Sequence, residues 1–248
     1  MPMDHLQVAN ELYSLASEGI ASELAWFFKT GPGEYGEGDK FLGIKVQGVR
    51  SVAAKFPKLS AEELDRLFDS DYHEVRFCAL AILTKQFERA RDQDLRQELF
   101  DYYLSKYDTG AINNWDLVDI SATRFGRQWA KDPDRIKKLL ERAKSENLWV
   151  QRSAVILNFP MIAEYDFGPT IEVSRELVDH PHDLIHKAVG WSLREVGKKE
   201  LTPLRAFLGE FAATMPRTML RYSIEKLPEV ERQMWLSRKA QSQLERGH

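Results

Sequence analysis

The sequence predicts an all-α protein in which antiparallel helix pairs stack into a superhelical solenoid. Three observations predict this fold class. One sequence pattern returns at a nearly constant interval, helix-start signals come in pairs along the chain, and the strict apolar and polar alternation of strands is absent.

The repeated pattern is a six-residue segment that begins at Val75, Val150, Ile185 and Met219. The last two steps between these anchors are 35 and 34 residues, and the first step, of 75 residues, equals about two such units. A degenerate copy around Trp115 fills that gap. A period of about 35 to 40 residues is typical of helical solenoids, in which each repeat contacts mainly its neighbours.

Helix-start signals divide the chain into pairs of helices. Ser60 and Glu63 form a capping-box pattern, and Asp132 and Thr202 each precede a proline suited to the first helical position. We expect the first helices of the pairs to begin near Ser60, Asp92, Asp132, Pro169 and Thr202. The second helices are expected to begin near His73, Asn113, Leu148, Asp183 and Pro216.

The segment before the first pair contains helix and then a strong break. Apolar residues between Asp4 and Lys29 recur at spacings of 3 and 4, which predicts one or two helices. Four glycines and a proline between Thr30 and Asp39 end them. This loop does not resemble a phosphate-binding loop, because no Lys-Ser or Lys-Thr follows its glycines and no strand precedes it. We expect a mobile connection or an edge that meets a ligand.

Composition favours one repeat domain over residues 1–228, followed by a last helix or a flexible tail over residues 229–248. Of the 248 residues, 43% are hydrophobic, which supports a packed interior. The formal net charge of −3 does not indicate a polyanion partner, so any basic surface must be local. Between Leu184 and Lys226, eight Lys or Arg stand against four acids.

Cysteine usage and hydropathy exclude several classes of protein. Cys78 is the only cysteine, so an intrachain disulfide and a cysteine-rich metal centre are excluded. The N-terminus has no secretory signal pattern, and no stretch approaches the ~18 apolar residues of a membrane span. We expect a soluble cytoplasmic monomer that has no contact with a membrane.

Equivalent cations appear two residues after three of the repeat anchors, at Arg152, Lys187 and Arg221. If the second helices line the concave face, these side chains form a stripe with a spacing of roughly 10 Å, suited to a nucleic-acid backbone. Phe77 breaks the stripe in the early copy. The alternative is that each cation pairs with an acid of the next repeat and only orders the stack.

The copy around Trp115 carries the sequence Asn-Asn-Trp-Asp-Leu-Val-Asp, which ends at Asp119. Asn113 is a good N-cap, and Asp116 suits the positive end of the helix. Trp115 and Asp119 are four residues apart and share a face. An aromatic plane is then presented beside an anion, a combination that suits a cationic ring.

Trp191, four residues after Lys187, supplies a possible second aromatic wall on a later repeat. An ordinary core position remains the alternative for each tryptophan. For Asp119 the alternative is a loop cap or an ion pair with Arg124 or Arg127.

A metal site is not expected. His182 and His186 have the i, i+4 spacing of zinc ligands, but no third ligand accompanies them on the same helix. We therefore expect neither a metal nor another cofactor.

Three motifs give the chain a family resemblance. Residues 114–119, 148–154 and 186–195, together with Phe41-Leu42-Gly43-Ile44, resemble the AlkD-type DNA alkylation repair family, whose members are alkylpurine DNA glycosylases built from HEAT-like repeats. The resemblance extends from about residue 20 to residue 226. It departs from the family pattern in a longer Gly31–Asp39 loop, in Phe27 at a tyrosine position, and in Val46–Arg50, which lacks a proline.

The resemblance implies excision of positively charged N3- and N7-alkylated purines, such as 3-methyladenine and 7-methylguanine, from duplex DNA. It implies that Trp115 and Trp191 flank the damaged nucleotide, that Asp119 serves the reaction at the sugar, and that Arg152 holds the backbone. Further DNA contacts are expected from Phe27, Lys29, Arg50, Lys187, Arg194 and Arg221. The alternative function is a non-catalytic repeat module that binds structured nucleic acid or a protein.

Overall fold

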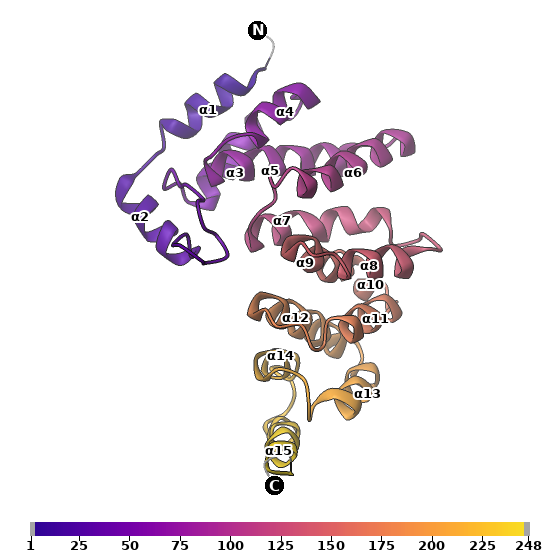
Figure 1. The fold of residues 1–248 in the computed structure, drawn as a ribbon. Coiled ribbons are helices and arrows are strands. Elements are labelled where there is room, and N and C mark those ends of the chain that lie inside the picture. Colours follow the sequence, from indigo (N-terminus) through magenta and orange to yellow (C-terminus); the bar gives the residue numbers. More distant parts are fainter. Residues whose placement is uncertain (1–2, 246–248) are drawn as a thin grey trace. The chain divides into compact units, whose positions relative to one another are not determined.

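The computed structural model describes residues 3–245, and its regular elements are helices joined by turns and loops (Figure 1). Within that range no strand forms, and the one β-type contact is an isolated bridge between Lys40 and Tyr72. The predicted all-α fold class is therefore confirmed. No helix of residues 3–245 is long and apolar enough to cross a membrane. The chain divides into two compact units, one ending at Phe125 and one beginning at Gly126.

The N-terminal unit is organised around one long, almost fully buried helix, α5. The helices α3, α4, α6 and α7 pack against it (Figure 1). The helices of this unit are α1 (His5–Tyr13), α2 (Glu18–Phe27), α3 (Val46–Lys55), α4 (Ala61–Phe68), α5 (His73–Arg89), α6 (Gln93–Asp108) and α7 (Trp115–Phe125).

The C-terminal unit is organised around α12, which packs against α9, α11, α13 and α14. A Cβ atom at Gly190 of α12 would lie 2.6 Å from the carbonyl oxygen of Met219, so the close approach of α12 and α14 requires glycine there. The elements of this unit are η1 (Gly126–Gln128), α8 (Arg135–Ala143), α9 (Leu148–Ile156), α10 (Phe159–Ala163), α11 (Gly168–Glu176), α12 (Asp183–Lys199), α13 (Leu201–Phe211), α14 (Arg217–Ser223) and α15 (Glu229–Glu245).

Most predicted helix starts lie within two residues of the observed ones, and the caps predicted at Asp132 and Thr202 were wrong. The Asp132 carboxylate accepts a bond from the Asp134 N–H in a turn, and α8 begins only at Arg135. Thr202 does not cap α13, which begins at Leu201. In both cases the Asp-Pro or Thr-Pro pair lies near the helix start but does not set it.

The predicted capping box at Ser60 is half formed. The Ser60 hydroxyl accepts a bond from the Glu63 N–H at 3.4 Å. The Glu63 carboxylate turns away from Ser60 and accepts a bond from the His5 N–H at 2.6 Å. The contact with His5 of α1 therefore takes the place of the bond from the Glu63 side chain to the Ser60 backbone N–H that completes a capping box.

The Gly31–Asp39 loop and the segment after it are tied to α2 and α5. The Gly36 N–H donates to the Lys29 carbonyl at 3.0 Å, and the His73 N–H donates to the Lys40 carbonyl at 2.8 Å. The buried Glu74 carboxylate accepts three N–H bonds, from Leu42, Gly43 and Ile44, at 2.9 to 3.1 Å. These bonds fix the Phe41–Ile44 segment against the start of α5.

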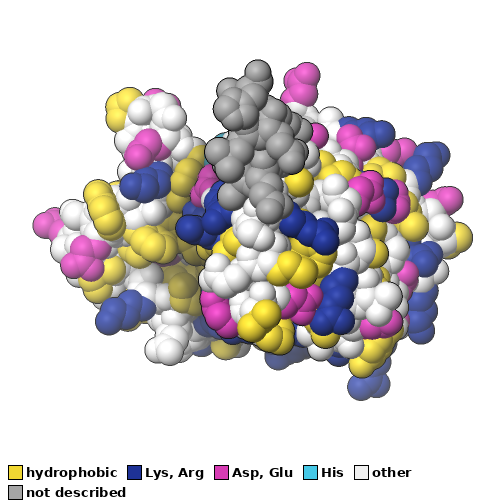
Figure 2. Space-filling view, turned by 90° about the horizontal axis from the view of Figure 1, so that it is seen from below, with side chains coloured by type: hydrophobic (Ala, Val, Ile, Leu, Met, Phe, Trp, Pro, Cys, Tyr) yellow, Lys and Arg dark blue, Asp and Glu magenta, His cyan; other side chains and the backbone are white. Residues whose placement is uncertain are grey.

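Charges of both signs are interspersed on the face of the molecule seen in Figure 2. Lys and Arg side chains there alternate with Asp and Glu and with apolar side chains. This face therefore fits the small net charge of −3, and basic surface has to be sought in local groups.

Candidate active site

The site predicted on α7 begins with a buried cap. The Asn114 side-chain oxygen accepts a bond from the Trp115 N–H at 2.9 Å, and its carbonyl accepts one from the Val118 N–H at 3.2 Å. Asn114, which is fully buried, therefore starts the helix, and the prediction of Asn113 as the cap was wrong. The Asn113 side-chain oxygen instead accepts a bond from Arg76 at 3.1 Å.

Trp115 is held in an aromatic group formed with the end of α2. Its ring stacks on Phe28, with centroids 5.4 Å apart and planes at 21°, and meets Phe27 edge to face at 6.1 Å. Phe28 is buried, whereas Phe27 is 54% exposed. The structure thus brings together Phe27 and Trp115, two residues that the sequence analysis selected separately. Asp119, one turn further along α7, is half-buried like Trp115.

Asp116 joins a buried chain of charges. Its carboxylate accepts a bond from the Leu117 N–H at 2.8 Å, as expected at a helix start, and also lies 2.9 Å from Nε2 of His73. The other ring nitrogen of His73, Nδ1, lies 2.9 Å from the Asp39 carboxylate, which Arg76 contacts at 2.5 Å. The order of charges is Arg76, Asp39, His73 and Asp116.

This arrangement perturbs the pKa values of the chain of charges. Burial alone would lower the pKa of His73, but the charge and hydrogen bond of Asp116, followed by those of Asp39, raise it to about 9. Burial would raise the pKa of Asp39, but its bonds to His73 and Arg76 hold it below the ordinary value. His73 is therefore an imidazolium near neutral pH.

A basic groove of about 290 Å³ lies where α3, α5 and α7 pack together in the N-terminal unit. Its floor is made of small side chains, which include Ala53, Ala81 and Thr84. Its charged lining consists of Arg50, Lys85, Glu88, Arg89 and Arg124. Four cations therefore surround one acid, whose carboxylate pairs with Lys85 at 3.2 Å and with Arg124 at 3.4 Å.

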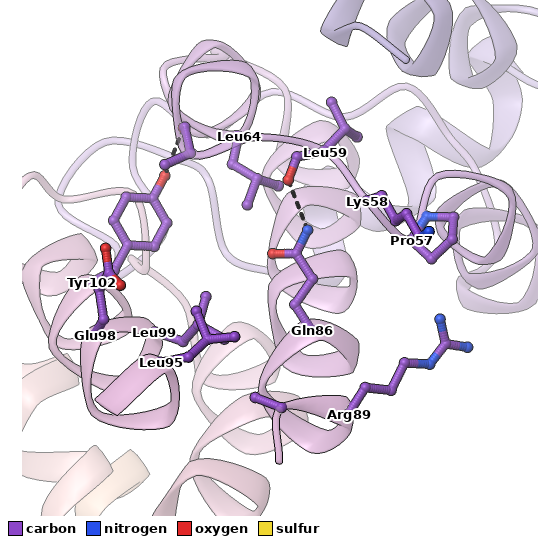
Figure 3. Close-up of a pocket in the computed structure, with 12 residues that line it drawn as sticks. Pro57, Lys58, Leu59, Leu64, Gln86, Arg89, Leu95, Glu98, Leu99 and Tyr102 are labelled. Atoms are coloured by element: carbon purple, nitrogen blue, oxygen red, sulfur yellow. Dashed lines mark hydrogen bonds between the residues drawn. The ribbon is translucent and has the colours of Figure 1, made fainter. Parts of the chain in front are cut away.

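A second cavity, of about 560 Å³, lies between α4, α5 and α6 and is mostly apolar. Figure 3 shows Leu95 and Leu99 of α6 around the same opening as Leu64 and Gln86. The Gln86 side chain donates a bond to the Leu59 carbonyl at 2.8 Å. None of the predicted site residues lines this cavity.

The predicted residues of the C-terminal unit differ in exposure. Arg152 on α9 is only 5% exposed, and its Nη1 donates to the Leu184 carbonyl at 2.6 Å. This bond ties α9 to the first turn of α12. Lys187 is half-buried and pairs with Asp183 at 2.7 Å, whereas Arg221 on α14 is exposed.

Trp191 is half-buried on α12. Its ring meets Phe159 of α10 at an angle of 60°, with centroids 4.6 Å apart, and its Nε1 donates to Glu195 at 3.2 Å. Arg194 forms an ion pair with Glu225 of the α14–α15 connection. The N-terminal and C-terminal groups of predicted residues thus lie in different units.

The histidines at the start of α12 make local bonds. His182 accepts a bond from the Leu184 N–H at 3.1 Å as the N-cap residue, and the ring of His186 bonds to the His180 carbonyl. Over residues 3–245, no three His, Cys, Asp or Glu side chains are grouped so that they could hold a metal ion.

Comparison with known proteins decides the family. The model of the family described as DNA alkylation repair enzyme matches residues 8–227. The chain belongs to this family. DNA alkylation repair enzymes have a role in the repair of alkylated DNA, and DNA is therefore the substrate on which this protein acts.

A solved structure supports the same fold for the repair enzyme. It is a protein of Enterococcus faecalis described as a predicted DNA alkylation repair enzyme, with a TM-score of 0.67 and 17% identity. The match covers 86% of this chain and 97% of that one. No curated protein matches the sequence.

Sequence reasoning missed two features of this repair enzyme. The first is the chain from Arg76 to Asp116, whose members lie 34 to 43 residues apart where they cross between elements. The second is the basic groove, which Lys85, Arg89 and Arg124 line together with Arg50. A signal for the groove was present, because Arg89 and Arg124 both lie in the last turns of their helices, α5 and α7.

Proposed function

We propose that this protein is a DNA glycosylase that hydrolyses the N-glycosidic bond of positively charged N3- and N7-alkylated purines in duplex DNA, as a monomer and without a cofactor. The observation that carries the proposal is the α7 group. There Trp115 is fixed by Phe28 and bordered by the exposed Phe27, and the Asp119 carboxylate follows one helical turn later. This pairing of aromatic planes with an anion suits a cationic base and the cationic sugar that forms as the base leaves.

The chemistry needs little from the protein, because the alkylated base already carries a positive charge. As the bond between C1′ and the glycosidic nitrogen breaks, its electron pair neutralises the base, which leaves without prior protonation. Asp119 stabilises the oxocarbenium-like sugar electrostatically and orients a water molecule. The water oxygen bonds to C1′, and its proton passes to the carboxylate.

The remaining predicted residues are assigned to DNA contacts. Trp191 would contact the damaged nucleotide, as the family resemblance implies, and Phe27, Lys29, Arg50, Lys187, Arg194 and Arg221 would contact the DNA strands. Arg152 would hold the DNA backbone, as the family resemblance implies, with its side chain oriented by the bond to the Leu184 carbonyl. The family resemblance implies a damaged base that does not enter a deep pocket, and the shallow, half-exposed aromatic group on α7 suits that mode.

The test is release of free 7-methylguanine or 3-methyladenine from methylated duplex DNA. We expect release by the wild type and a loss of about 10²- to 10³-fold in Asp119→Asn, the size found when one electrostatic transition-state contact is removed. Asp94→Asn, at an exposed position in the first turn of α6, is the matched control and should retain full activity. Full activity in Asp119→Asn would refute the mechanism.

A non-catalytic DNA-binding module is the second candidate, and the basic groove favours it. Arg50, Lys85, Arg89 and Arg124 provide a cationic surface whose use does not require Asp119. Salt-sensitive DNA binding by a wild type that releases neither base would support this candidate. If the wild type neither binds DNA nor releases a base, a protein partner is indicated instead.

A further inference from the structure

His73 is placed where only a doubly protonated ring satisfies its neighbours. Its Nδ1 faces the Asp39 carboxylate and its Nε2 faces the Asp116 carboxylate, both at 2.9 Å. Ionised carboxylates accept hydrogen bonds and donate none, so each nitrogen must carry a proton. A neutral imidazole would turn one lone pair toward a carboxylate oxygen.

The neighbours of His73 on all sides are consistent with a fixed cation. The side chains of His73 and Asp39 are 3% and 1% exposed, and that of Asp116 is 14% exposed. Arg76, on the same helix as His73, balances the second charge of Asp39. Two acids and two bases thus alternate, which is the condition under which buried charges are tolerated.

Two separate routes connect this cation to the candidate active site. The first is polar, because Asp116 directly follows Trp115 in the first turn of α7. The second is aromatic: Phe28 lies 5.1 Å from the His73 ring and stacks on Trp115 at 5.4 Å. Phe41 covers the His73 ring at 4.7 Å with planes at 23°. Loss of the His73 ring would therefore disturb both routes.

We propose that His73 is a positioning residue, a charged ring that locks the Gly31–Asp39 loop and α2 to the first turn of α7 and so sets the orientation of Trp115. Asp39 is the last residue of the loop, Phe28 is the C-cap residue of α2, and Asp116 belongs to α7. The effect on catalysis rests on the proposed glycosylase function. The orientation of Trp115 does not.

The first test is the protonation state of His73 in the folded wild type. A long-range proton–nitrogen spectrum of ¹⁵N-labelled protein at pH 8 should show both His73 ring nitrogens protonated, assigned by the loss of the signals in His73→Gln. Since the folded pKa of about 9 lies above the ordinary 6.5, the ion pairs of the charged ring contribute their full stability below about pH 6.5. Their contribution to stability is lost as the pH rises through about 9. A single protonated nitrogen at pH 8 would overturn the proposal.

The second test follows Trp115 in the full-length protein labelled with 5-fluorotryptophan. Its ¹⁹F signal is assigned by Trp115→Phe. His73→Gln keeps a side chain that can donate toward Asp116 but removes the charge and the ring, so the Trp115 signal should shift or broaden. His5→Gln, which removes a histidine bonded to Glu63 away from this group, is the control and should leave the signal unchanged. An unchanged Trp115 signal in a folded His73→Gln protein would overturn the proposal.

Two further measurements keep the proposal testable. If His73→Gln does not fold, Asp116→Asn removes only one contact and the same ¹⁹F readout applies. In the base-release assay, His73→Gln should lower kcat by about 10- to 100-fold, the range of groups that orient a functional residue, with little change in DNA affinity. A wild type that releases no base refutes the proposed function alone, because the two spectra still decide the role of His73.

Discussion

The two tryptophans of the proposed site are held in different ways. Trp115 stacks on Phe28, and the residue after it is bonded to the buried His73. Trp191 has one edge contact with Phe159, and its ring nitrogen donates to Glu195 on its own helix. The α7 group is thus preorganised by contacts with α2 and α5, whereas Trp191 has one aromatic contact outside α12. Preorganisation is what electrostatic catalysis requires, so the chemistry should depend mainly on α7.

The largest expected difference between the two units is the cost of breaking an ion pair. Arg76→Ala leaves the Asp39 carboxylate buried with one partner fewer, so we expect a loss of about 3 to 5 kcal/mol in the free energy of unfolding. Arg175→Ala in the C-terminal unit removes an exposed pair with Glu210 and should cost about 0 to 1 kcal/mol. Urea unfolding of both variants and the wild type measures the difference. If both variants lose the same free energy of unfolding, the buried chain of charges does not stabilise the fold more than an exposed ion pair does.

A smaller effect is expected for the basic groove and should appear as salt dependence. Each cation that contacts a phosphate adds about 0.9 to the slope of log affinity against log salt. Arg50→Ala and Arg124→Ala should each lower the slope by about that amount, whereas Arg66→Ala, at an exposed position on α4 outside the groove, should not. Affinities for one duplex at several salt concentrations provide the measurement. If all the variants have the same slope, the groove does not contact the DNA phosphates.

Helix positions were predictable because their signals are local. Ser60, Asp92 and Asn147 each cap the helix that follows them with a side-chain oxygen, and such bonds depend on three or four neighbouring residues. The choice between Asn113 and Asn114 was not local. Both positions are asparagines that suit a cap. The Asn113 side chain bonds to Arg76 of another helix, and the Asn114 side chain accepts the bond from the Trp115 N–H at the helix start.

Site chemistry was only partly predictable from the sequence. Trp115 and Asp119 were found because four-residue spacing places them on one face of a helix. The partnership of His73 with Asp39 and Asp116 depends on how three separate elements pack, which no spacing reveals. Burial of Arg152 was missed for a similar reason, because one of its bonds goes to the backbone carbonyl of Leu184 on another helix.

In the proposed mechanism, a positively charged base leaves with electrostatic help from the α7 group. Single-turnover release should therefore be measured from two otherwise identical duplexes, one with a single 7-methylguanine and one with neutral hypoxanthine at the same position. We expect rapid release of 7-methylguanine and no release of hypoxanthine above the rate without protein. Release of both bases at similar rates, or of neither, would contradict this mechanism.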